Sequence, residues 1–252
     1  MHLLKEIISH KTFKMKIALI GYGRMGHEIE AAAIGRGHSI DLVVDLDNRH
    51  DLEKAKPLGI EVAIEFTTPD TAFENVLECL RMQIPVVCGT TGWLKNYEDA
   101  VRICLKNETS FIHSSNFSIG VNILFRLNST LAGMMNHYAE YKPFIEEIHH
   151  IKKLDAPSGT AIILAKGIYS ENQSFSGWHF EAEQKEGSIP MRSVREGAVP
   201  GIHTVSWESD FDVISLRHEA KNRKGLALGA VIAAEFIFNR KGIFTMNDVL
   251  GF

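Results

Sequence analysis

Two adjacent histidines and a nearby lysine make residues 146–161 the part of this chain richest in reactive side chains; the segment reads EEIHHIKKLDAPSGTA. Histidine exchanges a proton near neutral pH, so His149 and His150 are candidate acids or bases. Lys153 adds a cation with a long, flexible reach. If residues 144–149 form a strand, neighbouring side chains point to opposite faces. Only one histidine can then face a ligand directly, unless the strand ends or bulges there.

The same stretch ends in a pattern typical of a helix N-terminus. Pro157 comes directly before Ser158, Gly159 and Thr160, and the apolar run 161–165 follows. A helix that begins here offers free backbone N–H groups and the positive end of its dipole, and the glycine permits close approach of an anion. The two halves of the segment together predict a carboxylate or phosphate site beside proton carriers.

A second motif, near the N-terminus, predicts a dinucleotide-binding turn. A strand expected at 16–20 and a helix expected at 27–36 enclose the six residues Gly21-Tyr22-Gly23-Arg24-Met25-Gly26. In this setting the glycines serve the tight turn, the approach of a pyrophosphate and close helix packing. The next strand, expected at 40–44, ends in Asp45, close to the position from which an acidic side chain meets the adenosine ribose hydroxyls.

Further polar loops are expected at the same edge of the first sheet. Strands alternate with helices at 62–66, 70–82, 85–88, 94–106 and 110–113. This alternation predicts a parallel sheet that binds its ligand at the carboxyl ends of the strands. The loops at these ends include Gly89-Thr90-Thr91-Gly92 and Ser114-Ser115-Asn116-Phe117. Glycine lets backbone groups approach a ligand and the hydroxyl and amide groups supply hydrogen bonds, so we expect both loops to bind the cofactor.

The remaining chain predicts a second sheet. A helix expected at 118–137 leads out of the first domain, and strands are expected at 144–149, 193–195, 203–207 and 211–218. Partial alternation of apolar and polar residues in these strands predicts one buried face and one partly covered face. The helix expected at 225–237 is rich in small residues and apolar almost all round, so it must be largely buried.

The central segment contains, in order, Glu147-Ile148-His149-His150, Lys153 and Asp155-Ala156-Pro157-Ser158-Gly159-Thr160-Ala161. This pattern resembles the signature of dihydrodipicolinate reductase, also called 4-hydroxy-tetrahydrodipicolinate reductase, of lysine and diaminopimelate biosynthesis. The resemblance implies an oxidoreductase that reduces 4-hydroxy-tetrahydrodipicolinate to tetrahydrodipicolinate, with loss of water. It also implies NADH or NADPH as cofactor, a small dicarboxylate as substrate and a homotetramer.

The resemblance implies roles for the matching residues. His149 and Lys153 are expected to be the catalytic, proton-donating pair, and His150 to bind the substrate. A substrate carboxylate is expected on the backbone N–H groups and hydroxyls of Ser158, Gly159 and Thr160. The two polar loops are expected to line the nicotinamide end of the cofactor. Arg195 and Arg223 are further candidates for the anion pocket.

The preference between NADH and NADPH stays open. The carboxylate of Asp45 repels a 2′-phosphate and thus favours NADH. Many members of the family carry an arginine directly after this acidic residue and also use NADPH, and here Leu46 stands at that position. Arg24 and Arg49 could still neutralise a phosphate.

The expected fold class is α/β, with a Rossmann-type dinucleotide-binding domain and an α+β substrate and oligomerisation domain that has a mixed open sheet. The first domain is expected to span residues 15–118 and, by resemblance to the family, to be completed by 224–252. Residues 119–223 are expected to bind the substrate and form the tetramer. Residues 1–14 are expected to be an N-terminal extension, either from an upstream start of translation or as an interface helix.

Composition excludes several other classes of protein. The 252 residues are 45% hydrophobic and 23% charged, with a net charge of −4, so neither nucleic acid nor an anionic membrane is an expected partner. No run approaches the roughly 18 apolar residues of a membrane span, and no secretory signal is recognised. The cysteines, Cys79, Cys88 and Cys104, lack metal-ligand spacing and an even count, so we expect free thiols, no metal and a cytoplasmic protein.

Three other functions were weighed against the reductase. Another two-domain dehydrogenase, acting on an acid such as aspartate or homoserine, would share the nucleotide-binding half but does not predict the central signature. A non-catalytic dinucleotide sensor could use the same fold, because fold alone does not fix function. A metal enzyme is disfavoured, because His149 and His150 lack the helical i, i+4 spacing of a two-histidine zinc motif.

Overall fold

The structure, a computed structural model, describes residues 13–183 and 185–252. The predicted N-terminal extension, residues 1–14, lies outside this range except for its last two residues. The chain forms two compact units. One comprises the residues up to Ser114 together with Ala227–Val249, and the other comprises Ser115–Leu226 with Leu250–Phe252.

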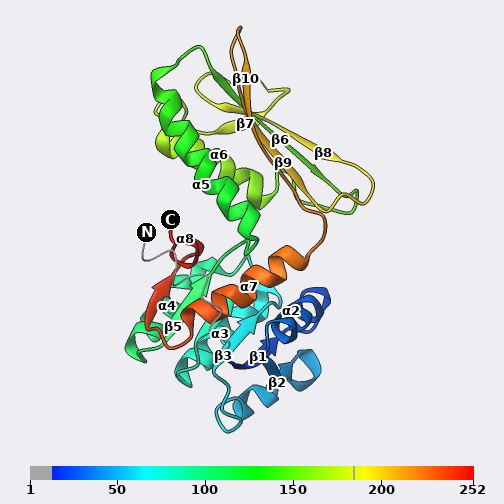
Figure 1. The fold of residues 1–252 in the computed structure, drawn as a ribbon, viewed down its shortest axis with the longest axis vertical. Helices are drawn as coiled ribbons and strands as arrows, with labels where there is room; N and C mark the ends of the chain where they lie inside the picture. The colour runs from blue at the N-terminus through cyan, green and yellow to red at the C-terminus, as the bar shows by residue number, and fades with distance from the viewer. Residues whose placement is uncertain (1–12, 184) are drawn as a thin grey trace. The chain divides into compact units, whose positions relative to one another are not determined.

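A six-stranded parallel sheet forms the centre of the first unit (Figure 1). Its strands, in spatial order, are β11 (Gly242–Phe244), β5 (Ser110–His113), β4 (Val86–Cys88), β3 (Val62–Glu65), β1 (Lys16–Ile20) and β2 (Ser39–Val44). The inner strands are almost wholly buried, as expected for a sheet that helices cover on both faces. The strand order reverses at β1, where sheets of this type bind their ligands.

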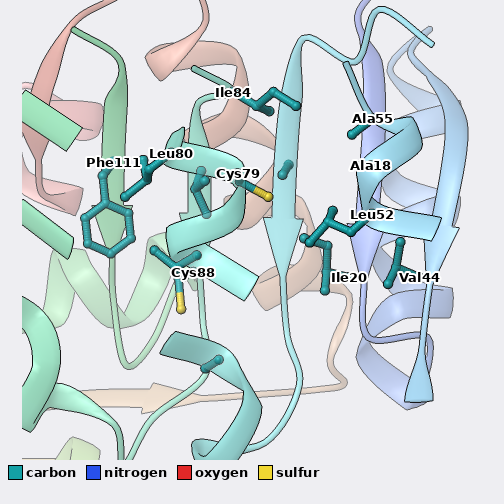
Figure 2. Packing of buried hydrophobic residues seen from close by; sticks show 14 of the residues in the cluster. Ala18, Ile20, Val44, Leu52, Ala55, Cys79, Leu80, Ile84, Cys88 and Phe111 are labelled. Carbon is teal, nitrogen blue, oxygen red and sulfur yellow. The ribbon is translucent and has the colours of Figure 1, made fainter. Parts of the chain in front are cut away.

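Helices connect these strands and enclose an apolar core. They are α2 (Arg24–Gly35), the 3₁₀ helix η1 (Leu46–Lys54), α3 (Pro69–Arg81), the short η2 (Leu94–Asn96), α4 (Tyr97–Lys106), α7 (Lys224–Ile237) and α8 (Met246–Leu250). Cys79 and Leu80 on α3 pack with Ile20, Cys88 and Phe111 of the sheet in one cluster (Figure 2). Burial of these side chains, at about 25 cal/mol per Å² of apolar surface, stabilises the unit that carries the glycine turn.

A salt bridge joins the end of α2 to α7 within the first unit. Arg36 donates two hydrogen bonds of 2.7 Å to the carboxylate of Glu235. His38 lies 2.8 Å from the same carboxylate. Paired, charge-assisted contacts of this kind fix both distance and orientation, so the helix that follows the glycine turn is tied to a segment from the far end of the chain.

The second unit is built on a mixed five-stranded sheet. Its strands, in spatial order, are β10 (Val213–Glu219), β9 (Ile202–Glu208), β6 (Lys142–His149), β8 (Ile189–Arg195) and β7 (Trp178–Phe180). β9 runs antiparallel to β6 and β10, whereas β8 runs parallel to β6 and β7. Two long helices, α5 (Ile119–Met134) and α6 (Gly159–Glu171), lie side by side on one face, and the short η3 (Met135–His137) follows α5 (Figure 1).

Strand β6 places the central motif on the covered face of this sheet. Ile145, Glu147 and His149 alternate with half-exposed neighbours and are buried. Ile145 belongs to an apolar cluster with Leu164 of α6 and Trp207 of β9. A carboxylate and an imidazole therefore continue a row of side chains that begins in the hydrophobic core.

The predicted fold class is confirmed by these two sheets. Two three-residue strands, β7 and β11, were not predicted, because so short a segment shows no clear periodicity. The helix predicted to start at residue 27 begins at Arg24, because the last glycine of the turn already lies within the helix. Within the described parts of the chain, every helix is too short or too polar to span a membrane.

Candidate active site

The glycine turn between β1 and α2 shows a separate physical reason for each glycine. Gly21 has φ +92°, and an added Cβ would lie 2.0 Å from the carbonyl oxygen of Phe66. A Cβ at Gly26 would lie 2.5 Å from the carbonyl oxygen of Gly21. Gly23 is different, because a Cβ there would meet nothing within 4 Å. Packing thus requires the outer glycines, while the middle glycine leaves the space through which a pyrophosphate could approach.

The other residues of this turn lie at the start of α2 and at the end of β2. Arg24 is exposed and is the first residue of the helix, and Met25 is half-buried. Asp45 follows β2, and its carboxylate accepts hydrogen bonds from the backbone N–H groups of Tyr22, at 3.3 Å, and Leu46, at 2.9 Å. The acidic side chain therefore lies against the glycine turn, as the ribose assignment requires.

A buried carboxylate supports the loops that follow β3 and β4. Glu65 is fully buried and accepts hydrogen bonds from the Thr67 N–H, at 3.1 Å, and the Cys88 thiol, at 2.9 Å. Burial raises the pKa of Glu65 above the ordinary glutamate value, although hydrogen bonds from Cys88, Thr67 and Thr90 oppose the shift. Thr90 is buried and accepts the Thr67 N–H on its hydroxyl at 2.7 Å, whereas Thr91 is exposed. The predicted cofactor loop therefore rests on Glu65, which the sequence did not single out.

Gly89, at the start of the same loop, is also fixed by packing. A Cβ at this position would lie 2.2 Å from ring atoms of Phe66. The loop after β5 is divided between the two units: Ser114 closes the first, and Ser115, Asn116 and Phe117 open the second. Asn116 accepts the Ser118 N–H on its side-chain oxygen at 2.9 Å, and Phe117 is fully buried.

The strand that carries the two histidines ends between them. β6 closes at His149, which is 7% exposed, and His150 follows as a half-buried residue in the turn. The carbonyl oxygen of His150 accepts the Lys153 N–H at 3.0 Å, which closes that turn. Because the strand ends at His149, the alternation of side chains along a strand does not force His150 to the opposite face.

Glu147 connects three elements around His149. It is fully buried, and both of its oxygens accept the backbone N–H of Ser158, at 3.1 and 3.0 Å. Arg195, at the end of β8, donates to the same carboxylate at 3.2 Å. His203 on β9 stands 3.8 Å away, and its ring centroid lies 5.0 Å from that of His149. The result is a compact cluster of a carboxylate, two imidazoles and a guanidinium.

Lys153 forms an ion pair within the turn rather than with the cluster. Its ammonium group lies 2.9 Å from both carboxylate oxygens of Asp155. The carbonyl oxygen of Asp155 in turn accepts a hydrogen bond of 2.5 Å from Arg195. The turn that carries the lysine is therefore tied to the buried cluster through Arg195, and within the ion pair the Lys153 side chain is half-buried whereas Asp155 is exposed.

The helix start predicted at Ser158 is confirmed. Ser158 is the N-cap of α6, and its hydroxyl accepts the Ala161 N–H at 3.2 Å and lies 3.2 Å from Nε2 of His203. The Ser158 N–H donates to Glu147. In the first turn of the helix, the N–H groups of Gly159 and Thr160 therefore remain available to a ligand. A Cβ at Gly159 would meet nothing within 4 Å, so this side is open.

The cluster perturbs the pKa of Glu147, His149 and His203. Burial lowers the pKa of His203 to about 4, with a further contribution from His149. Burial also lowers the pKa of His149, and the nearby Glu147 carboxylate opposes that effect. For Glu147 burial acts to raise the pKa, but hydrogen bonds from Ser158 and Ser193 and the charge of His149 together outweigh it, and the pKa is lowered. At neutral pH the site thus holds a carboxylate anion beside a neutral His203.

Comparisons with known proteins identify the family of this chain. Residues 15–117 match the family model "Dihydrodipicolinate reductase, N-terminus", and residues 120–250 match "Dihydrodipicolinate reductase, C-terminus". The chain belongs to the dihydrodipicolinate reductase family. It is 51% identical over 237 residues to the 4-hydroxy-tetrahydrodipicolinate reductase of Christiangramia forsetii, covering 94% of this chain and 98% of that one. The corresponding protein of Alkaliphilus metalliredigens is 33% identical, covering 94% of this chain and 99% of that one.

A solved structure supports the fold of this family member. The dipicolinate-bound dihydrodipicolinate reductase from Paenisporosarcina sp. TG-14 aligns with a TM-score of 0.78 and 23% identity, covering 92% of this chain and 98% of that chain. Both sheets described above thus follow the architecture of a reductase of this family.

Proposed function

We propose that this chain reduces 4-hydroxy-tetrahydrodipicolinate with His149 and Lys153 as proton donors and with the start of α6 as the site of a substrate carboxylate. As a member of the family, the chain is a 4-hydroxy-tetrahydrodipicolinate reductase, an oxidoreductase of lysine and diaminopimelate biosynthesis. The reaction takes up a hydride and a proton and releases water. One observation supports these residue roles: the buried carboxylate of Glu147 contacts both His149 and the backbone N–H of Ser158 at the start of α6.

The residues of the first unit fit a nicotinamide dinucleotide. Only the middle glycine of the turn leaves open space, and a dinucleotide needs backbone approach at that place. Gly21, Tyr22, Gly23, Arg24, Met25 and Gly26 would hold the pyrophosphate, Asp45 the ribose, and the residues Gly89, Thr90, Thr91, Ser114, Ser115, Asn116 and Phe117 the nicotinamide end. Bound there, the cofactor supplies the hydride.

NADH is the cofactor that the surroundings of Asp45 favour. Leu46, where an arginine would welcome a 2′-phosphate, is 77% exposed. Arg49 is engaged with Glu78 at 2.6 Å. Arg24, exposed at the first turn of α2, is the residue we assign to NADPH where that cofactor is used.

The substrate site has to bind a dianion, stabilise developing charge and deliver a proton. The N–H groups of Gly159 and Thr160 and the dipole of α6 bind one carboxylate. A dianion bound beside His149 favours the imidazolium form, so substrate binding itself loads the donor that burial alone would leave neutral. His150 and Lys153, both in the turn after β6, complete the site, and the lysine exchanges Asp155 for the substrate.

A homotetramer in the cytoplasm is the proposed state of the protein. The helices α5 and α6 cover one face of the second sheet, and the outer strand β10 together with the loop before it exposes Phe211 (84%), Val213 (53%) and Ile214 (39%). Exposed apolar residues at this outer strand favour association of subunits along it. The three cysteines are free and buried, as in a reducing compartment.

The test follows the absorbance of NADH and of NADPH while substrate is generated in situ from pyruvate and aspartate semialdehyde by the preceding synthase. We expect turnover with the intact protein, and a loss of at least about 10²-fold in kcat for His149→Gln and for Lys153→Ala. Lys152→Ala, which removes an exposed neighbouring lysine, is the matched control and should keep the intact rate. Cofactor binding without turnover by the intact protein would refute the reductase function and favour a dinucleotide sensor, whereas an unchanged kcat in either donor variant would refute the donor role of that residue.

A further inference from the structure

Glu147 is a fully buried carboxylate at the centre of the site, and the proposed function gives it no part in the reaction. It lies two residues before His149 on the same face of β6, so both side chains point to the same side of the sheet. Its Oε2 is 3.6 Å from Nδ1 of His149. This separation is too long for a hydrogen bond, but it is short enough for a charge on one group to act strongly on the other.

The opposite edge of the same imidazole lies against Gly201, which has no side chain to crowd it. An added Cβ at Gly201 would stand 3.1 Å from Nε2 of His149 and 3.3 Å from its Cδ2. Nδ1 has no hydrogen-bond partner among the described residues. The ring therefore has a carboxylate beside Nδ1, and beside Nε2 a glycine that places no side chain there. In this arrangement the carboxylate stabilises the imidazolium, and Nε2 is the nitrogen that exchanges a proton with a ligand.

The same carboxylate also fixes the backbone that begins α6. Both oxygens accept the Ser158 N–H, and one accepts Arg195, which in turn donates to the Asp155 carbonyl. Proton donor and helix start are thus held by one group. A displacement of Glu147 would move both relative to each other, and small errors of placement are costly in catalysis.

We propose that Glu147 is a positioning residue for the reductase reaction: its carboxylate orients the His149 ring so that Nε2 faces the substrate, and it holds the turn from which α6 begins. The proposal rests on the proposed role of His149 as proton donor. It goes beyond that role, because it states which nitrogen delivers the proton and which charge keeps the imidazolium in place.

Several titratable groups other than Glu147 face His149, and the test must separate their effects from that of Glu147. From β8 comes Arg195, from β9 comes His203, and from the turn after β6 come Lys153 and Asp155. Lys153 and Arg195 disfavour the imidazolium, whereas Asp155 and Glu147 favour it. Loss of the Glu147 charge leaves the two cations less opposed, so His149 should give up its proton at lower pH.

The experiment compares Glu147→Gln with Glu146→Gln in the full-length protein. Glu146 undergoes the same chemical change one residue away, on the half-exposed face, where it pairs with Arg192. We measure kcat against pH, and we titrate the His149 side chain by NMR of the protein with ¹⁵N-labelled histidine. For Glu147→Gln we expect the alkaline limb of kcat and the His149 titration to move down by about one pH unit or more. Glu146→Gln should superimpose on the unchanged protein.

A second variant separates charge from shape and serves if Glu147→Gln does not fold. Glu147→Asp keeps the charge, so its pH limb should lie closer to that of the unchanged protein than the limb of the Gln variant does. Equal shifts in the Asp and Gln variants, or a His149 titration that neither variant moves, would overturn the proposal. An unchanged kcat in His149→Gln would instead overturn the donor role, whatever the NMR titration shows.

Discussion

Gly21 and Gly23, two residues apart in one turn, should respond to the same substitution in opposite ways. In Gly21→Ala the left-handed φ of +92° costs about 1–2 kcal/mol. The new Cβ, 2.0 Å from the Phe66 carbonyl oxygen, forces a backbone shift that adds about 1–3 kcal/mol. The free energy of unfolding should therefore fall by about 2–5 kcal/mol, which lowers Tm by roughly 4–20 °C.

Gly23→Ala should instead leave stability almost unchanged and weaken cofactor binding. Gly23 has φ −78° and an added Cβ meets no atom within 4 Å, so the change in unfolding free energy should stay within about 1 kcal/mol. The methyl group occupies the path of the pyrophosphate, and Kd for NADH should rise at least about tenfold, or about 1.4 kcal/mol. Thermal unfolding and NADH fluorescence titration measure both quantities. Equal Tm values for the two variants, or an unchanged Kd in Gly23→Ala, would refute this account of the turn.

Two further predictions concern stability and thiol reactivity. The pKa of Glu235 is lowered, because the hydrogen bonds from Arg36 and His38 outweigh its burial. The ion pair therefore stabilises the fold above the ordinary glutamate pKa of 4.5, and this stabilisation is lost as the pH falls below that value. In urea unfolding, Glu235→Gln should be about 1 kcal/mol less stable than the unchanged protein at pH 7, and the difference in unfolding free energy should disappear in acid. Burial and the neighbouring Glu65 raise the pKa of Cys88 well above its ordinary value, so iodoacetamide at pH 7.5 should alkylate this thiol only after unfolding; rapid labelling of the native protein, detected by peptide mass, would contradict its burial.

Most of the fold could be predicted from the sequence because each long element repeats its own pattern. Continuous apolar runs predicted the inner parallel strands, and Ser158 with its flanking residues predicted the start of α6. β7 and β11 could not be predicted in the same way. Each has three residues and is a strand only because a neighbour, β8 or β5, supplies the hydrogen bonds.

The contacts of the candidate site were harder to predict from the sequence, because they depend on strand register. In the sheet, Glu147 lies opposite His203 on β9 and His149 lies opposite Arg195 on β8. Nothing in the spacing of these residues along the chain fixes that register. One local signal was present in the sequence. Glu147 lies between Ile145 and His149 on the buried side of an alternating strand, and a charged residue on that side needs a hydrogen-bonding or charged partner.

The position of β11 has a consequence for synthesis on the ribosome. β11 adds to β5, yet more than a hundred residues, including all of the second sheet, separate them in the chain. Until α7 and β11 emerge, β5 is an open edge strand and the first unit is incomplete. A nascent chain stalled before Gly242 should therefore expose an unpaired, aggregation-prone edge, and the sheet of the first unit should be completed only after all strands of the second sheet have been synthesised.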